Sequence, residues 1–126
     1  MLGPLFGAML LKEAYKNGER FHVYLSGPMT GLPDYNRPAF DKLAADIRAE
    51  GKTDFNPAEV GERDVIRTRS WYMRKDIEAL LKSDSVHVLQ GWEKSEGAKL
   101  EIEIARQLEL PIVFVHLNTK KGKKHE

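Results

Sequence analysis

Phe21-His22-Val23-Tyr24-Leu25 runs directly into Ser26-Gly27-Pro28-Met29-Thr30-Gly31 near the start of the chain. The first five residues are mostly aromatic or β-branched, whereas glycine and proline punctuate the six that follow. The pattern predicts a strand that opens into a loop at Ser26. Two interpretations of the loop remain open: a backbone that approaches an anion or a ribose closely, or an ordinary turn between a strand and a helix.

Helix and strand patterns alternate along the rest of the chain. The apolar spacing predicts helices over residues 37–50, 71–82 and 95–108, the second capped by Ser70, and strands over residues 53–56, 85–89 and 111–117. The last strand is of the continuous apolar kind expected in a buried parallel sheet. The alternation predicts an α/β fold with an open parallel sheet of about four to five strands flanked by helices. Ligands of such sheets bind beyond the carboxyl ends of the strands, after Leu25, Asn56 and Leu89.

Two carboxylates occupy positions where helices usually carry apolar residues. Glu101 falls within the predicted apolar stripe of Ala98, Ile104, Ala105 and Leu108. Asp76 likewise shares a helix face with Tyr72, Met73, Ala79 and Leu80. A buried carboxylate is costly unless it is paired or used.

The two carboxylates allow two interpretations. Two acids that converge on one cleft are the usual apparatus for breaking a bond at an anomeric carbon. Alternatively, Asp76 pairs with Arg74 or Lys75, and Glu101 with Lys99 or Arg106. In the catalytic interpretation Glu101 must ionise near neutral pH, so we expect interactions that lower its pKa, or at least adequate solvation, to prevail over burial. Asp76 then experiences a like charge, which raises its pKa and suits it to donate a proton.

The segment that precedes residue 101 offers further polar and aromatic contacts. Ser95 and Gly97 stand at the start of a predicted helix, where free N–H groups favour a phosphate, although a plain N-cap has the same appearance. Trp92 is placed either to stack on a base or to cover the edge of the sheet.

Composition limits the classes of function. The 126 residues fit one domain, and a formal net charge of +1 from 20 basic and 19 acidic residues gives no case for a nucleic-acid-binding face. The chain has no cysteine, which suits a cytoplasmic protein. The four histidines lack metal-ligand spacing, and no motif implies a cofactor, so we expect neither a metal nor a cofactor.

The two ends of the chain differ from its centre. Residues 1–20 form a predicted N-terminal extension, residues 21–117 the domain, and residues 118–126 a basic tail. The apolar part of the extension, residues 1–11, lacks the basic start of a targeting signal and is far shorter than the roughly 20 residues that a membrane span needs. Its apolar residues are too many to stay exposed, so they should pack on the body or on a second copy in a homo-oligomer: Leu2, Leu5, Phe6, Met9, Leu10 and Leu11.

Four segments together resemble the nucleoside 2-deoxyribosyltransferase-like superfamily, in particular a branch from phages and bacteria whose members are mostly described only as a domain of unknown function. The segments are Tyr24-Leu25-Ser26-Gly27-Pro28-Met29-Thr30-Gly31, Asn56-Pro57-Ala58, Tyr72-Met73-Arg74-Lys75-Asp76, and Gly91-Trp92-Glu93-Lys94-Ser95-Glu96-Gly97-Ala98-Lys99-Leu100-Glu101. The resemblance spans roughly residues 21–115 and implies a Rossmann-like parallel sheet.

The resemblance also implies roles for individual residues. Glu101 matches the nucleophilic glutamate of the superfamily and Asp76 its aspartate on a helix. The resemblance and the positions described above predict substrate contacts from Tyr24, Ser26, Gly27, Met29, Asn56, Trp92, Ser95 and Gly97.

The implied activity is cleavage of an N-glycosidic bond in a nucleotide or deoxynucleotide through a glutamyl-sugar intermediate. Two alternatives remain: a nucleoside 2-deoxyribosyltransferase, which passes the same intermediate to another base, and a nucleotide-binding or sensor module without turnover. The nucleoside 5′-monophosphate hydrolases of the superfamily use a serine and an arginine in the first loop, where this chain has Pro28 and Thr30. Arg37, Arg67 and Arg69 are the candidate substitutes for binding the phosphate.

Overall fold

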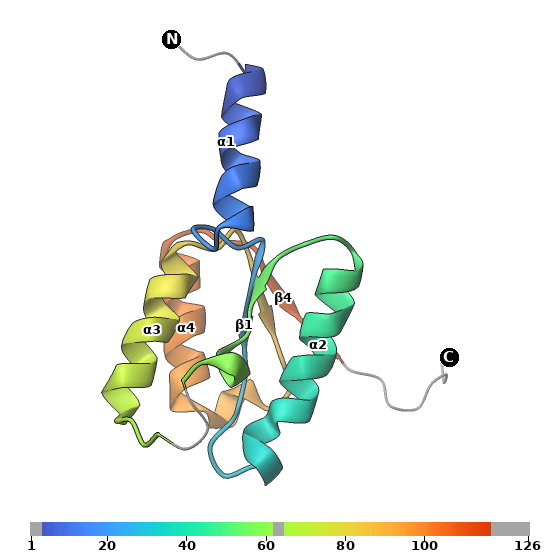
Figure 1. Cartoon of the computed structure of the whole chain (residues 1–126). Helices are drawn as coiled ribbons and strands as arrows, with labels where there is room; N and C mark the ends of the chain where they lie inside the picture. The colour runs from blue at the N-terminus through green and yellow to red at the C-terminus, as the bar shows by residue number, and fades with distance from the viewer. Residues whose placement is uncertain (1–3, 62–64, 117–126) are drawn as a thin grey trace.

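A four-stranded parallel sheet forms the centre of the computed structural model, which describes residues 4–61 and 65–116 (Figure 1). The strands are β1 (Val23–Ser26), β2 (Asp54–Phe55), β3 (Val86–Val88) and β4 (Ile112–Phe114), in the spatial order β2-β1-β3-β4. All three pairings are parallel. The predicted Rossmann-like α/β fold is therefore confirmed.

Helices cover both faces of the sheet. Helix α2 (Arg37–Ala49) lies on one face, and α3 (Arg69–Leu81) and α4 (Glu96–Gln107) lie side by side on the other. Short 3-10 turns complete the connections: η1 (Pro33–Asn36), η2 (Pro57–Glu59) and η3 (Trp92–Lys94). The strand order reverses between β1 and β3, which is where parallel sheets of this kind open a crevice for a ligand.

Side chains of β1 alternate between two hydrophobic clusters. Val23 and Leu25 pack with α2, whereas Tyr24 packs with the residues of β3, α3 and α4. Since side chains two residues apart share a face of a strand, Ser26 points to the same side as Tyr24. The face of β1 covered by α4 thus ends in two hydroxyl groups.

Two predictions about helix α3 and helix α4 need correction. Helix α3 begins at Arg69 rather than at Trp71, and its N-cap is Thr68 instead of Ser70, because the Thr68 hydroxyl accepts the backbone N–H of Trp71 at 3.1 Å. Helix α4 ends at Gln107, so Leu108 lies beyond the packed face and is 47% exposed.

The last strand also differs from the prediction. Strand β4 lies at the edge of the sheet, and Val113 and Phe114 are 45% and 42% exposed. Helix α2 covers β1 and β2 but makes no comparable contact with β4, so an apolar run that predicted a buried strand belongs here to a half-covered edge.

Helix α1 (Pro4–Lys16) extends away from the domain at the end of the sheet opposite the carboxyl ends of the strands (Figure 1). Its last turns are attached through Tyr15, whose hydroxyl donates to Asp84 and whose ring stacks on His22 at 3.8 Å between centroids. Met9, Leu10 and Leu11 are about half exposed in the single chain. These three side chains therefore do not pack closely on the body.

The basic tail, residues 118–126, and Leu2 lie outside the described residues, as do the side chains of Leu5 and Phe6. Within the part of the chain that is described, no helix combines the length and the apolar character needed to cross a membrane.

Candidate active site

Glu101 is buried in α4 and held by two hydroxyl groups from β1. Glu101 is only 6% exposed. The Tyr24 hydroxyl donates a hydrogen bond to Oε2 at 2.8 Å, and the Ser26 hydroxyl donates one to Oε1 at 2.7 Å. Both donors come from the strand face that α4 covers, so the alternation of β1 sets this contact. An ionised carboxylate has about four lone-pair sites, so each oxygen retains capacity for a further partner.

The electrostatics of Glu101 correct the sequence-based expectation. Burial raises the pKa of Glu101 to about 7, and the negative charge of Asp76 adds to the rise. The hydrogen bonds from Ser26 and Tyr24 act in the opposite direction but do not prevail. The expectation that lowering interactions would dominate was wrong, because the carboxylate lies deeper than a helix-face argument indicated.

Asp76 lies on α3 and faces the same space as Glu101. Its Oδ1 atom is buried and accepts no hydrogen bond within the described residues. Burial raises the pKa of Asp76 to about 7, as expected in direction, although the cause is desolvation rather than the like charge of Glu101. An unpartnered buried carboxyl that retains its proton near neutral pH is equipped to donate to a ligand.

The alternative in which both acids pair with neighbouring bases is not observed. Lys99 forms its ion pair with Glu96 at 2.9 Å, and the oxygens of Glu101 contact hydroxyl groups instead. The described residues give Asp76 no ion pair with Arg74 or Lys75.

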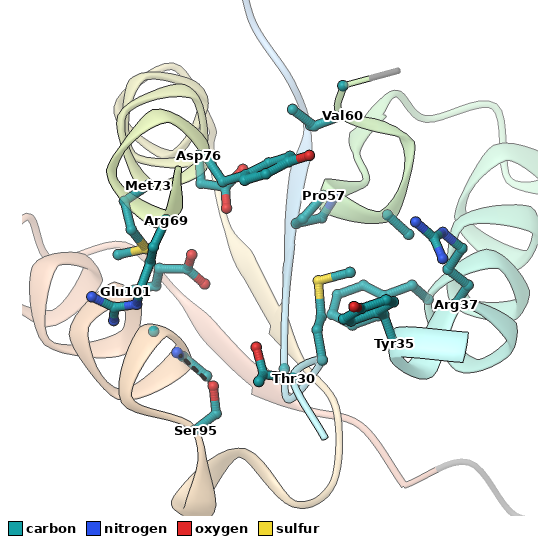
Figure 2. Close-up of a pocket in the computed structure, with 18 of the residues that line it drawn as sticks. Thr30, Tyr35, Arg37, Pro57, Val60, Arg69, Met73, Asp76, Ser95 and Glu101 are labelled. Carbon is teal, nitrogen blue, oxygen red and sulfur yellow. Dashed lines mark hydrogen bonds between the residues drawn. The ribbon is translucent and has the colours of Figure 1, made fainter. Parts of the chain in front are cut away.

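A cavity of about 700 Å³ opens above the two carboxylates at the carboxyl ends of the strands. The loop after β1, the turn after β2, the first half of α3 and the start of α4 form its walls, as Figure 2 shows. Both Asp76 and Glu101 point into this space. The volume falls within the range of small-molecule sites, which is about 300–1,000 Å³.

Three arginines line the cavity: Arg37, Arg67 and Arg69. Arg69 lies on the same side as Glu101 and Ser95, and Arg37 lies on the opposite side (Figure 2). Arg67 stacks its guanidinium on the Trp71 ring at 4.7 Å. The cavity therefore combines two acids at its base with positive charge on its walls, which suits a ligand that carries both hydroxyl groups and an anion.

The sequence profile of one family matches residues 21–114. The chain belongs to that family, described as a domain of unknown function (DUF4406). No curated protein and no solved structure matches the chain. The matched range begins after α1 and includes both carboxylates, the two hydroxyl donors of β1 and the arginines of the cavity.

Half of the predicted substrate contacts lie on the cavity wall of this DUF4406 domain: Gly27, Met29, Ser95 and Gly97. The Ser95 hydroxyl also accepts the backbone N–H of Ala98 at 3.1 Å, so the serine acts as an N-cap while it borders the cavity. Tyr24 and Ser26 lie behind Glu101, where they position the carboxylate.

Gly27 is needed for a close approach between two loops. A Cβ atom at this position would lie 2.8 Å from Cβ of Leu89, which is shorter than side chains tolerate. The glycine therefore lets the chain leaving β1 pass against the chain leaving β3, at the point where the strand order reverses.

Asn56 and Trp92 are placed differently from the prediction. Asn56 is buried; its amide donates to Asp41 at 3.0 Å and its carbonyl oxygen accepts the N–H of Ala58, so it fixes the η2 turn beside the cavity. Trp92 is absent from the cavity wall and packs on Phe114 at 5.5 Å between centroids. Of its two expected roles, covering the edge of the sheet is the one observed.

Sequence reasoning missed several wall residues, chief among them Tyr35, Pro57, Val60 and Tyr72. Tyr35 lies in a segment without helix or strand periodicity, whereas Pro57 and Val60 lie at the η2 turn and Tyr72 lies on α3. Three candidate ligands for a metal, drawn from His, Cys, Asp and Glu, do not occur together anywhere in residues 4–61 and 65–116.

Proposed function

We propose that this domain is an N-glycosidase that cleaves the bond between base and sugar in a nucleotide or deoxynucleotide. The observation that carries the proposal is the Glu101 carboxylate, buried, held by Tyr24 and Ser26, and open to the same cavity as the unpartnered Asp76. A fixed carboxylate beside a protonated one is the arrangement that displacement at an anomeric carbon needs.

In the first step an oxygen of ionised Glu101 forms a bond to C1′ of the sugar. The bond between C1′ and the base nitrogen breaks, and its electron pair remains with the base. Neutral Asp76 supplies the proton that the departing base requires. The products of this step are a sugar ester of Glu101, an ionised Asp76 and a neutral free base.

In the second step a water molecule resolves the ester. Its oxygen bonds to C1′, the bond between C1′ and Glu101 breaks with its electron pair returning to the carboxylate, and Asp76 takes up the proton of the water. Both carboxyl groups are thereby restored. Glu101 therefore has to be ionised and Asp76 protonated at the start of each cycle, which favours a narrow range around neutral pH because burial brings both pKa values to about 7.

The charged wall of the cavity supports a substrate with a phosphate. Arg67 and Arg69 line the cavity, and we assign them to the phosphate in place of the arginine that the first loop lacks. The N-terminus of α4 at Ser95 and Gly97 adds backbone N–H groups and a favourable helix dipole on the same side as Arg69.

The test is a chromatographic screen of nucleosides, deoxynucleosides and their 5′-monophosphates for release of free base. We expect at least one monophosphate to be cleaved, and a folded Glu101→Gln variant to lose several orders of magnitude in rate. Tight binding of a monophosphate without turnover would overturn the proposal in favour of a binding module. Transfer of the sugar to an added second base, with no free sugar phosphate formed, would identify a transferase instead.

A further inference from the structure

Three consecutive residues before α2 adopt a left-handed backbone. Asp34, Tyr35 and Asn36 have φ angles of 52°, 53° and 60°. Residues other than glycine rarely take such values, and three in a row are rarer still. Strain of this kind persists only where surrounding contacts fix it, and it concentrates at ligand-binding sites.

Contacts on both sides hold this left-handed turn. The Asn36 amide donates to the carbonyl oxygen of Pro28 at 2.9 Å, which fastens the turn to the loop after β1. Arg37 bonds Asp34 at 3.0 Å and places its guanidinium 5.5 Å from the centre of the Tyr35 ring. These contacts fix the shape of the turn and thereby the position of the Tyr35 ring.

Tyr35 presents that ring to the cavity. It lines the wall across from Glu101, with its side chain directed toward the centre of the cavity (Figure 2). The residue is 56% exposed, although burying a tyrosine ring is favourable. Met29 and Phe40 also line the cavity, so the Tyr35 ring belongs to a partly apolar wall opposite Glu101.

The direction of displacement at C1′ assigns a role to this wall, a step that rests on the proposed function. A nucleophile and its leaving group occupy opposite faces of the carbon under attack. With Glu101 on one side, the departing base has to lie toward the other side, where Tyr35 stands. A planar base offers a π face, and an aromatic side chain binds such a face without selecting one base strongly.

We infer that Tyr35 is the residue on which the leaving nucleobase stacks, and that the left-handed turn of residues 34–36 exists to hold this ring. Arg37 is a positioning residue that contacts both Asp34 and the Tyr35 ring. Tyr35 thus determines that the substrate carries an aromatic base, while the opposite side of the cavity holds the sugar and the phosphate.

Binding measurements test the inference without requiring turnover. In a Glu101→Gln background, which prevents cleavage, the probes are the four common deoxynucleoside 5′-monophosphates and 2-deoxyribose 5-phosphate, the same ligand without a base. Calorimetric titration compares the background protein with added Tyr35→Leu, Tyr35→Phe and, as a control, Phe114→Leu. Phe114 is an aromatic residue of similar exposure outside the cavity.

We expect Tyr35→Leu to weaken the best monophosphate about tenfold or more while changing the affinity for deoxyribose phosphate less than about twofold. Tyr35→Phe and Phe114→Leu should bind both probes like the background protein. Equal weakening of both probes by Tyr35→Leu, or no weakening of either, would overturn the inference and leave the proposed cleavage intact.

The remaining outcomes separate the two proposals. A monophosphate whose binding depends on Tyr35, but which the wild-type protein never cleaves, would support base stacking and overturn the glycosidase. A background protein that binds neither probe, together with a wild-type protein that releases base from none of the screened substrates, would overturn both.

Discussion

The phenolic oxygen of Tyr24 lies 2.8 Å from Oε2 of Glu101 and joins the central strand to the helix that carries the proposed nucleophile. The bond lowers the pKa of Glu101, but burial raises it by more, so the pKa stands at about 7. The phenol thus does two things: it fixes the orientation of the carboxylate and favours the ionised form that attack on a sugar requires.

Removing this hydroxyl should shift the pH dependence of catalysis. In Tyr24→Phe the pKa of Glu101 should rise further, so the acid limb of kcat/KM should move to higher pH by about one to two units, given that a hydrogen bond to a charged group contributes about 1.5–3 kcal/mol. The alkaline limb, which reports loss of the Asp76 proton, should move less. A pH–rate profile measures both limbs.

Tyr15→Phe is the matched control for this measurement, because it deletes a hydroxyl that bonds Asp84 at the far end of the sheet. Its profile should match that of the wild type. An acid limb that stays in place or moves to lower pH in Tyr24→Phe would contradict the role given to the phenol.

Stability should depend on pH through Glu101 in a defined direction. The folded protein binds the proton of this carboxyl more tightly than the unfolded chain, since the pKa rises from 4.5 to about 7 on folding. Its contribution to stability is therefore intact below about pH 4.5 and is lost as pH rises to about 7. Glu101→Gln, which carries no charge, should exceed the wild type in unfolding free energy at pH 8 by about 1–3 kcal/mol, and by little at pH 4.5.

Urea denaturation at the two pH values measures this difference. Glu103→Gln serves as the control, because Glu103 is exposed on the outer face of α4. If Glu101→Gln is less stable than the wild type at pH 8, burial does not destabilise the ionised form of Glu101 as described above.

Much of the fold could be predicted from the sequence because helix and strand periodicity is a local property. The order of elements and the inward position of Glu101 and Asp76 both follow from residue spacing. The half-covered edge at β4 could not be predicted, since an apolar run such as Ile112–Phe114 does not reveal how many helices cover it. The left-handed turn at Tyr35 is likewise set by contacts with Pro28 and Arg37.

The candidate site was predicted in part for a similar reason. Ser95, Gly97 and Glu101 belong to one helix and its N-cap, so their spacing in the sequence predicts that they line the same cavity, as observed. Trp92 precedes the same helix, but its side chain packs on Phe114 of the edge strand and does not line the cavity. The pKa of Glu101 depends on how deeply its carboxyl group is buried. That depth is set by β1, α3 and α4, which meet only in the folded chain.

Arg69 should contribute to binding of the phosphate. Arg69→Gln should raise KM for the cleaved monophosphate about tenfold or more while leaving cleavage of the matching nucleoside unchanged, because the lost interaction is with the anion. Steady-state kinetics with both substrates provide the comparison. Arg74→Gln, on the same helix but outside the cavity, should leave both values unaltered. An unchanged KM for the monophosphate in Arg69→Gln would exclude Arg69 as a phosphate ligand.

We also expect the protein to form a homo-oligomer through α1. Met9, Leu10 and Leu11 expose between 45% and 59% of their surface in the single chain, and a second copy offers the apolar contact that its own body does not. Light scattering at micromolar concentration should give a mass above the 14.4 kDa of one chain, and Leu10→Glu should reduce it toward that value. A wild-type protein that is already monomeric would contradict this expectation.

The stereochemistry of cleavage in the presence of methanol tests most directly whether Glu101 is the nucleophile. Two successive displacements at C1′, first by Glu101 and then by methanol, restore the original configuration, whereas direct attack by solvent inverts it. Nuclear magnetic resonance distinguishes the methyl glycosides, which do not interconvert as free sugars do. The account predicts that a β-configured nucleotide yields the β-methyl glycoside of the sugar phosphate. Formation of the α-methyl glycoside would contradict a covalent intermediate on Glu101.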